Sequence, residues 1–129
     1  MNGRFLTYVY CLVKSAKAPS NDKPPPSLPQ MAAARWLEVG GGQWLLVSNA
    51  PDSTYSAAAL AEGAKAIDWV SRCALAHQAM VEHASSAAAV GPMKLFTLFR
   101  GDERAVEHFS RQKLRLSKVI AKVAGCEEY

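Results

Sequence analysis

The sequence predicts an α+β protein, built as a two-layer sandwich in which two helices cover one face of an antiparallel sheet. Three observations support this prediction. Apolar segments with many β-branched and aromatic residues are separated by glycine and proline turns. Two longer segments repeat apolar residues every three or four positions, as helices do. The order is strand, proline-rich loop, strand, strand, helix, strand, helix, which is ferredoxin-like with the first helix replaced by the loop.

The composition is typical of a globular domain. The chain has 129 residues, of which 50% are hydrophobic and 20% are charged. A chain of this length buries enough surface to fold without a metal ion or a disulfide, and no apolar run is long enough to span a membrane. We therefore expect one domain over residues 1–129, with no cofactor, no metal ion and no membrane contact.

The net charge and the cysteines give little information about a partner. The formal net charge of +4 is a mild excess, which favours an anionic partner only weakly. Cys11, Cys73 and Cys126 are an odd number of widely spaced cysteines without a CxxC pair. They predict free thiols in a reducing cytoplasm.

The first elements are a central strand and a proline-rich loop. Residues 4–14 are apolar on both alternating sides, which indicates a strand covered on both faces. Residues 15–30 contain Pro19, Pro24-Pro25-Pro26 and Pro29, a density that forbids a helix. We expect this loop to be an exposed, locally stiff linker.

The next elements form a hairpin. Residues 35–39 and 43–48 are two strand candidates on either side of Gly40-Gly41-Gly42. Glycine adopts the positive φ that tight turns require, so three glycines favour a β-hairpin. A phosphate-binding loop is the alternative, but neither GxGxxG nor GxxxxGK[ST] is present and no helix follows.

Residues 55–83 predict a long, alanine-rich helix. Asp52 and Ser53 precede it as capping residues, and Gly63 marks a kink or a break. Two apolar lines follow the helical repeat. The first line is Leu60, Ala64, Ile67, Ala74 and Val81, and the second is Trp69, Cys73, Ala76 and Met80.

The last elements are a strand and a second helix. Residues 93–99, MKLFTLF, follow Gly91-Pro92 and predict a short buried strand. Gly101-Asp102 then begins a helix, with Asp102 and Glu103 at its positive end. Its apolar line is Val106, Phe109, Leu116, Ile120 and Val123, and Gly125 is a natural C-terminal cap.

The chain offers few groups for catalysis. His77 and His83 are separated by about 600° of helical rotation, so they point to different faces and cannot share a metal ion. Cys73 lies mid-helix on an apolar line and is expected to be a structural thiol. The helix start already explains Asp102 and Glu103.

A row of basic residues follows one face of the second helix, at positions i, i+4, i+7 and i+11. Its members are Arg111, Arg115, Lys118 and Lys122. Such a face is usually only solvated, but it also forms a possible docking surface for an acidic partner. Nucleic acid is less favoured, because the row has no interleaved aromatic residues and no known nucleic-acid motif is present.

Three segments follow one another with a specific spacing. They are DWVSRCALAHQAMVEH (residues 68–83), GPMKLFTLF (residues 91–99) and DERAVEHF (residues 102–109). In this order they resemble the gas vesicle protein F/L (GvpF/GvpL) family, in which a helix with alanine and histidine precedes a strand with proline, a basic residue, threonine and phenylalanine. The matching residues here are Ala74, His77, Pro92, Lys94, Thr97 and Phe99. Leu95 and Phe96 replace the family's usual phenylalanine and glycine, so we expect different packing there.

The resemblance implies an accessory protein of gas vesicle formation, located at the gas vesicle or in the cytoplasm. Such proteins are thought to bind the small, hydrophobic major shell protein and other accessory proteins. The resemblance implies no enzymatic activity and no cofactor, and it leaves self-association open. Family members continue beyond the position of Tyr129 into a helical second domain, so we expect residues 1–129 to be the N-terminal domain alone.

Two other classes of function stay open. The ferredoxin-like fold also occurs in small-ligand and effector-binding domains. A deep, polar pocket would favour that hypothesis, and a filled interior would count against it. The third hypothesis is a weak enzyme that uses His77, although we expect this histidine to be hydrogen-bonded within the fold.

Overall fold

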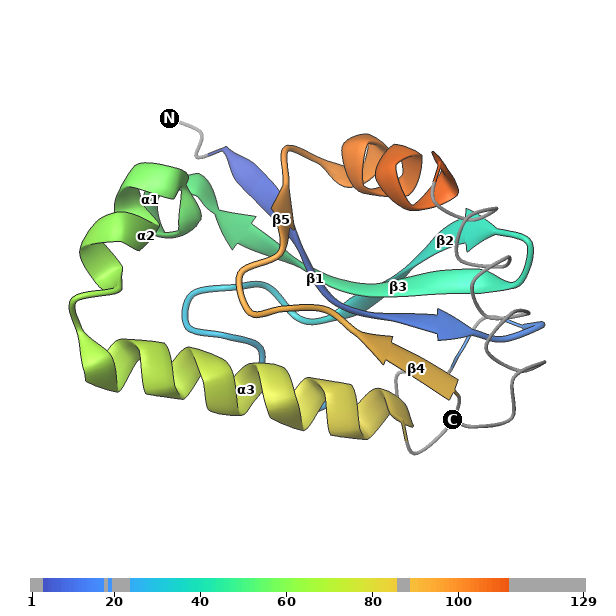
Figure 1. Cartoon of the computed structure of the whole chain (residues 1–129), viewed down its shortest axis with the longest axis horizontal. Coiled ribbons are helices and arrows are strands. Elements are labelled where there is room, and N and C mark those ends of the chain that lie inside the picture. Colours follow the sequence, from blue (N-terminus) through green and yellow to red (C-terminus); the bar gives the residue numbers. More distant parts are fainter. Residues whose placement is uncertain (1–3, 18, 20–23, 86–88, 112–129) are drawn as a thin grey trace, which may run out of the picture.

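A computed structural model describes residues 4–17, 19, 24–85 and 89–111 (Figure 1). Within these residues, one antiparallel sheet contains five strands. They are β1 (Phe5–Lys14), β2 (Arg35–Gly40), β3 (Gln43–Pro51), β4 (Ala89–Pro92) and β5 (Leu98–Phe99). The helices α1 (Asp52–Tyr55), α2 (Ala57–Gly63) and α3 (Ile67–Ser85) connect β3 to β4, and residues 102–111 form a further helix. The predicted α+β class with an antiparallel sheet is confirmed.

The strand order β2-β3-β1-β4 is the ferredoxin-like arrangement. The proline-rich loop takes the chain from β1 to β2 and leaves β3 between them. The three helices take it from β3 to β4 and leave β1 between them. As predicted, β1 is central, because it pairs with β3 on one side and with both β4 and β5 on the other.

The hairpin between β2 and β3 is also confirmed. Gly40, Gly41 and Gly42 have φ values of 113°, 62° and 78°, a region that other residues rarely adopt. The backbone N–H of Ser15 donates to the carbonyl oxygen of Gly42 at 2.7 Å. The turn is therefore joined to the end of the central strand.

The side chains of β1 and β3 alternate between two separate hydrophobic clusters. One cluster contains Tyr8, Tyr10 and Leu46 and packs against Cys73 and Met80 of α3. The other cluster contains Val9, Leu45 and Val47 and packs against Ala105 and Phe109 of the 102–111 helix. The prediction placed both helices on one face, but the residues that they bury show that they cover opposite faces. The cause is that β1 is apolar on both sides, and both sides must be shielded from water.

The predicted 55–83 helix is three helices. α2 ends at Gly63, where the break was expected, and Ser56 rather than Asp52 or Ser53 provides a cap, by accepting from Ala59 N at 3.2 Å. α1 begins at Asp52 without a side-chain cap. Because the chain breaks after Gly63, the apolar repeat before the break cannot set the buried face of α3.

One of the two predicted apolar lines is wrong at its middle. Leu60 and Val81 pack against the core, but Ile67 is 77% exposed, and Ala64 and Ala74 are exposed as well. The second line is confirmed, because Cys73 and Met80 are fully buried and Trp69 and Ala76 pack against the same cluster. α3 also buries His77 and Ala84.

The predicted continuous strand over residues 93–99 is wrong. β4 ends at Pro92, β5 contains only Leu98 and Phe99, and the segment between them turns away, with a φ of 66° at Phe96. Met93 N donates to Tyr10 O at 3.0 Å, and Val9 N donates to Thr97 O at 2.9 Å. Both ends of this 93–97 turn are thus held on β1, and its middle bulges out of the sheet.

The proline-rich loop differs from the expected exposed linker in its second half. Leu28 is 1% exposed and belongs to the cluster under α3. The carbonyl oxygen of Pro29 accepts from the hydroxyl of Tyr55 at 2.8 Å. An apolar residue and a backbone acceptor therefore fix this part of the loop against the core.

The 102–111 helix begins at Asp102 as predicted and buries Phe109. Val106 is half-buried. The remaining residues of the predicted apolar line and its cap, Leu116, Ile120, Val123 and Gly125, lie outside the described residues.

Replacing Leu46 with alanine should lower the free energy of unfolding by about 2–5 kcal/mol, because its fully buried side chain would leave a cavity. Chemical denaturation measures this change. Leu75→Ala is the matched control, since Leu75 is 71% exposed on α3 and its loss should change stability by less than about 0.5 kcal/mol. Equal losses in the two variants would contradict the described core.

Candidate functional site

His77 lies at the centre of a buried chain of hydrogen bonds. Its Nδ1 is 2.7 Å from the hydroxyl oxygen of Tyr8, and its Nε2 is 2.8 Å from the carbonyl oxygen of Met93. The hydroxyl oxygen of Tyr8 also accepts from the backbone N–H of Phe96 at 3.1 Å. These contacts join β1, α3 and the 93–97 turn, and we call them the Tyr8–His77 link.

The partners determine the protonation of His77. The Met93 carbonyl can only accept, so Nε2 carries a proton and donates it. Burial lowers the pKa of His77, since desolvation disfavours the imidazolium, and the Met93 hydrogen bond opposes this only in part. The ring is therefore neutral at pH 7, and Nδ1 accepts the proton of the Tyr8 hydroxyl.

This arrangement is suited to holding the fold together. Tyr8 is fully buried and His77 is 7% exposed. Burial also raises the pKa of Tyr8 far above its ordinary value. Both nitrogens of the ring and the hydroxyl already have partners, so neither group is available to a substrate. The expectation that His77 is hydrogen-bonded within the fold is confirmed.

The other predicted motif residues occupy different environments. Thr97 donates from its hydroxyl to Lys94 O at 2.7 Å and closes the 93–97 turn, while the Lys94 side chain is exposed. Pro92 ends β4 opposite Cys11. Phe99 packs against the rings of His108 and Phe109 at centroid distances of 5.1 and 5.8 Å. Ala74 is exposed and takes no part in the Tyr8–His77 link.

A second polar cluster, which the sequence did not reveal, joins the 102–111 helix to the sheet. Arg35 donates from both terminal nitrogens to the two carboxylate oxygens of Asp102, at 2.9 and 2.8 Å. Thr7 donates to the same carboxylate at 2.7 Å, and Arg35 also donates to Asn49 Oδ1 at 2.6 Å. The Arg35 hydrogen bonds, assisted by Thr7, hold the pKa of Asp102 below its ordinary value. The carboxylate has a structural role in addition to its place at the helix start.

The described cysteines are structural as well. Cys11 and Cys73 are free and buried. Burial raises the pKa of the Cys11 thiol to about 12 and raises that of Cys73, so neither forms a reactive thiolate at pH 7. Cys126 lies outside the described residues.

The described part of the chain also shows no other recognisable centre. Its acidic, histidine and cysteine side chains include no group of three or more that could hold a metal ion. None of its helices combines the length and the apolarity that crossing a membrane requires. Of the predicted basic face, Arg111 pairs with Glu107 at 2.7 Å, and Arg115, Lys118 and Lys122 lie outside the described residues.

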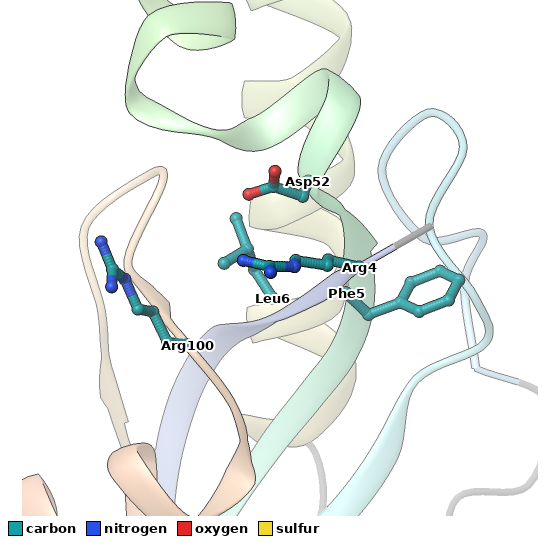
Figure 2. A pocket seen from close by; sticks show the side chains of 5 residues that line it. All are labelled: Arg4, Phe5, Leu6, Asp52 and Arg100. Atoms are coloured by element: carbon teal, nitrogen blue, oxygen red, sulfur yellow. The ribbon is translucent and has the colours of Figure 1, made fainter. Parts of the chain in front are cut away.

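Two hollows formed by described residues lie near the start of β1 and beside β5. One, of about 340 Å³, is lined by Arg4, Phe5, Leu6, Asp52 and Arg100 (Figure 2). A second, of about 350 Å³, adjoins it between β5 and α1–α2. Both are open at the surface.

Tyr8→Phe should destabilise the fold by about 1–3 kcal/mol, because it leaves the N–H of Phe96 and Nδ1 of His77 buried without a partner. Tyr10→Phe is the matched control. Its hydroxyl contacts Ser48 Oγ at 2.9 Å and donates weakly to Met31 Sδ at 3.9 Å, and Ser48 keeps Ser27 as a neighbour at 3.2 Å, so a smaller loss is expected. Denaturation of both variants tests this, and a Tyr8 loss no larger than the Tyr10 loss would show that the link adds little.

The stability should fall as the pH drops below about 6.5, the ordinary pKa of histidine. The folded state holds the pKa of His77 below this value, so the unfolded chain binds the proton first and gains relative stability. The contribution of His77 to the stability is complete above pH 6.5. It is lost as the pH falls from 6.5 to the pKa of His77 in the folded state. His77→Gln should flatten this part of the profile, and His83→Gln is the control on the same helix. An unchanged slope in His77→Gln would contradict the assignment.

The comparisons with known proteins agree with the motif. No curated protein and no solved structure gives a significant match. The family model described as gas vesicle synthesis protein GvpL/GvpF matches residues 6–129. This match covers nearly the whole chain, including β1, α3 and the 93–97 turn that the Tyr8–His77 link joins. The chain therefore belongs to the GvpL/GvpF family of gas vesicle synthesis proteins.

Proposed function

We propose that this chain is a non-enzymatic assembly factor of gas vesicles, which acts by binding the major shell protein and other gas vesicle accessory proteins. The observation that carries the proposal is the family match over residues 6–129. It assigns a role in gas vesicle assembly. The proposal adds that the chain acts at the gas vesicle through protein–protein contacts.

The state of the buried polar groups supports a role without catalysis. In the described residues, His77 and Tyr8 are occupied by each other and by the 93–97 turn, and Asp102 is occupied by Arg35 and Thr7. General acid–base or nucleophilic catalysis needs a reactive group that can reach a substrate. These groups instead hold elements together.

The filled interior counts against a small-ligand or effector-binding domain. Beneath α3 the described core is occupied by large buried side chains, including Tyr8, Tyr10, Tyr55 and Met80. Among described side chains, Gln43 Oε1 is the one buried polar atom without a partner. A small-ligand pocket usually combines an enclosed apolar space with several converging polar groups. The surface is therefore the better candidate for binding.

Binding of an acidic partner to the basic face stays a prediction; this face is formed by Arg111, Arg115, Lys118 and Lys122. The proposal also leaves self-association of the chain open. Binding of the shell protein requires neither the basic face nor self-association.

Co-purification tests the proposal. The tagged chain is co-expressed with the major shell protein, and the amount of shell protein retained is measured. An unrelated α+β domain of similar size and charge, carrying the same tag, is the control bait. We expect retention by this chain and by His77→Gln, because the histidine is internal, and no retention by the control. No difference between the chain and the control bait would refute binding of the shell protein.

A further inference from the structure

A groove on the surface runs between β5 on one side and α1–α2 on the other. The two hollows share the lining residues Leu6, Asp52 and Arg100, so they adjoin one another. A third hollow, of about 360 Å³, shares Leu98, Phe99 and Arg100 with the second and extends past β5 to the 102–111 helix. We call these three hollows together the β5 groove.

The middle of the β5 groove is apolar. Leu60 of α2, Phe96 of the 93–97 turn and Leu98 of β5 line it, and all three are half-buried. Phe96 stacks on Trp69 with an interplanar angle of 13°, which holds its ring in place. This part of the groove fits an aliphatic or aromatic side chain from outside.

Unpaired arginines stand along the groove. Arg4, Arg100 and Arg104 are exposed, and within the described residues their side chains have neither a hydrogen bond nor an ion pair. Figure 2 shows that Arg4, the residue before β1, and Asp52 point toward the side on which Arg100 lies. The acidic lining residues are Asp52 and Glu107, of which Glu107 is neutralised by Arg111. The described groove therefore has a surplus of positive charge.

The backbone at this edge of the sheet is also open to a partner. Among the described strands, β5 pairs with β1 alone, so its other side has no strand beside it. The second and third hollows are both lined by Leu98 and Phe99, so a segment bound in the groove lies next to β5. Edge strands bind extended peptides in this way, with main-chain hydrogen bonds and with pockets for alternate side chains.

We infer that the β5 groove binds an extended, acidic and apolar segment of a partner protein. An apolar side chain of the segment occupies the middle of the groove, and its carboxylates lie near Arg4, Arg100 and Arg104. A polyphosphate or a nucleic acid fits less well, because the centre of the groove is apolar and offers such a chain no charged partner. The groove and the class of segment that it binds do not depend on the proposed function. Only the further step, that this partner is the shell protein, rests on it.

A labelled peptide of alternating glutamate and leucine is the first probe, with its binding followed by fluorescence anisotropy. The groove variant is Arg4→Glu with Arg100→Glu. The matched control is Lys17→Glu with Arg72→Glu, which makes the same charge change at two exposed positions that line none of the three hollows. We expect the groove variant to bind the peptide at least about tenfold more weakly than the control does.

Three results would overturn the inference. The first is equal weakening in the groove variant and the control, which would indicate an effect of net charge alone. The second is no binding of the peptide by the wild-type chain at low salt. The third is tighter binding of a short single-stranded oligonucleotide than of the peptide. Circular dichroism of each variant confirms that it is folded, as expected for exposed residues without partners.

The same variants in the shell-protein co-purification separate the inference from the proposed function. Loss of shell protein in the groove variant and retention in the control place the shell protein in the groove. Retention in both variants overturns the groove as its binding site while the proposed function stands. Peptide binding through the groove, together with no retention of shell protein by the wild-type chain, refutes the proposed function and leaves the groove as a site for another acidic segment.

Discussion

The structure depends on covering both faces of β1 at once. Tyr8 and Tyr10 lie on one face and Val9 on the other, and all three are fully buried. Burial of such side chains stabilises the folded state by about 1.5–3 kcal/mol each. This stabilisation requires that water is excluded from both faces of β1. The helices on opposite faces, the inward packing of the proline-rich loop and the attachment of β4 and β5 along one edge are all ways of meeting this requirement.

Covering β1 with aromatic residues creates a second requirement, because a buried hydroxyl needs partners. Tyr8 meets it through His77 and the Phe96 N–H, and Tyr10 meets it through Ser48. On the other face, Thr7 and Arg35 satisfy Asp102. Each polar contact joins two elements that are far apart in sequence. These polar contacts, buried at Tyr8 and His77 and only partly buried at Arg35 and Asp102, thus help specify which elements meet, while apolar burial supplies most of the stabilisation.

This division of roles leaves the surface for recognition. The histidine and the acidic residue that the sequence draws attention to are both engaged within the fold. Three unpaired arginines and an apolar groove lie beside β5, where the 93–97 turn pushes the chain out of the sheet. The chain belongs to a family of gas vesicle synthesis proteins, and these surface features are where the described molecule could contact a partner.

The sequence by itself determined the elements whose signals are local. The two-sided apolar pattern of residues 4–14 indicated a central strand, the three glycines indicated the hairpin, and Gly63 indicated the break in the helical segment. These signals are readable because backbone preference and apolar periodicity act within a few neighbouring residues. The family motif could also be recognised in the sequence. The sequence indicated that its histidine, His77, is hydrogen-bonded within the fold, but not which groups it contacts.

The tertiary structure decided what depends on contacts between distant residues. The face of α3 that is buried, with Cys73 and Met80 inward and Ala74 outward, follows from where the chain resumes after Gly63. The split of the 93–99 segment depends on Tyr8, whose hydroxyl accepts from Phe96 N, and the inward position of Leu28 depends on the space under α3. The opposite placement of the 102–111 helix depends on Arg35 and Thr7. The split of the 93–99 segment and the placement of the 102–111 helix are set by partners far away in the chain, which no local periodicity encodes.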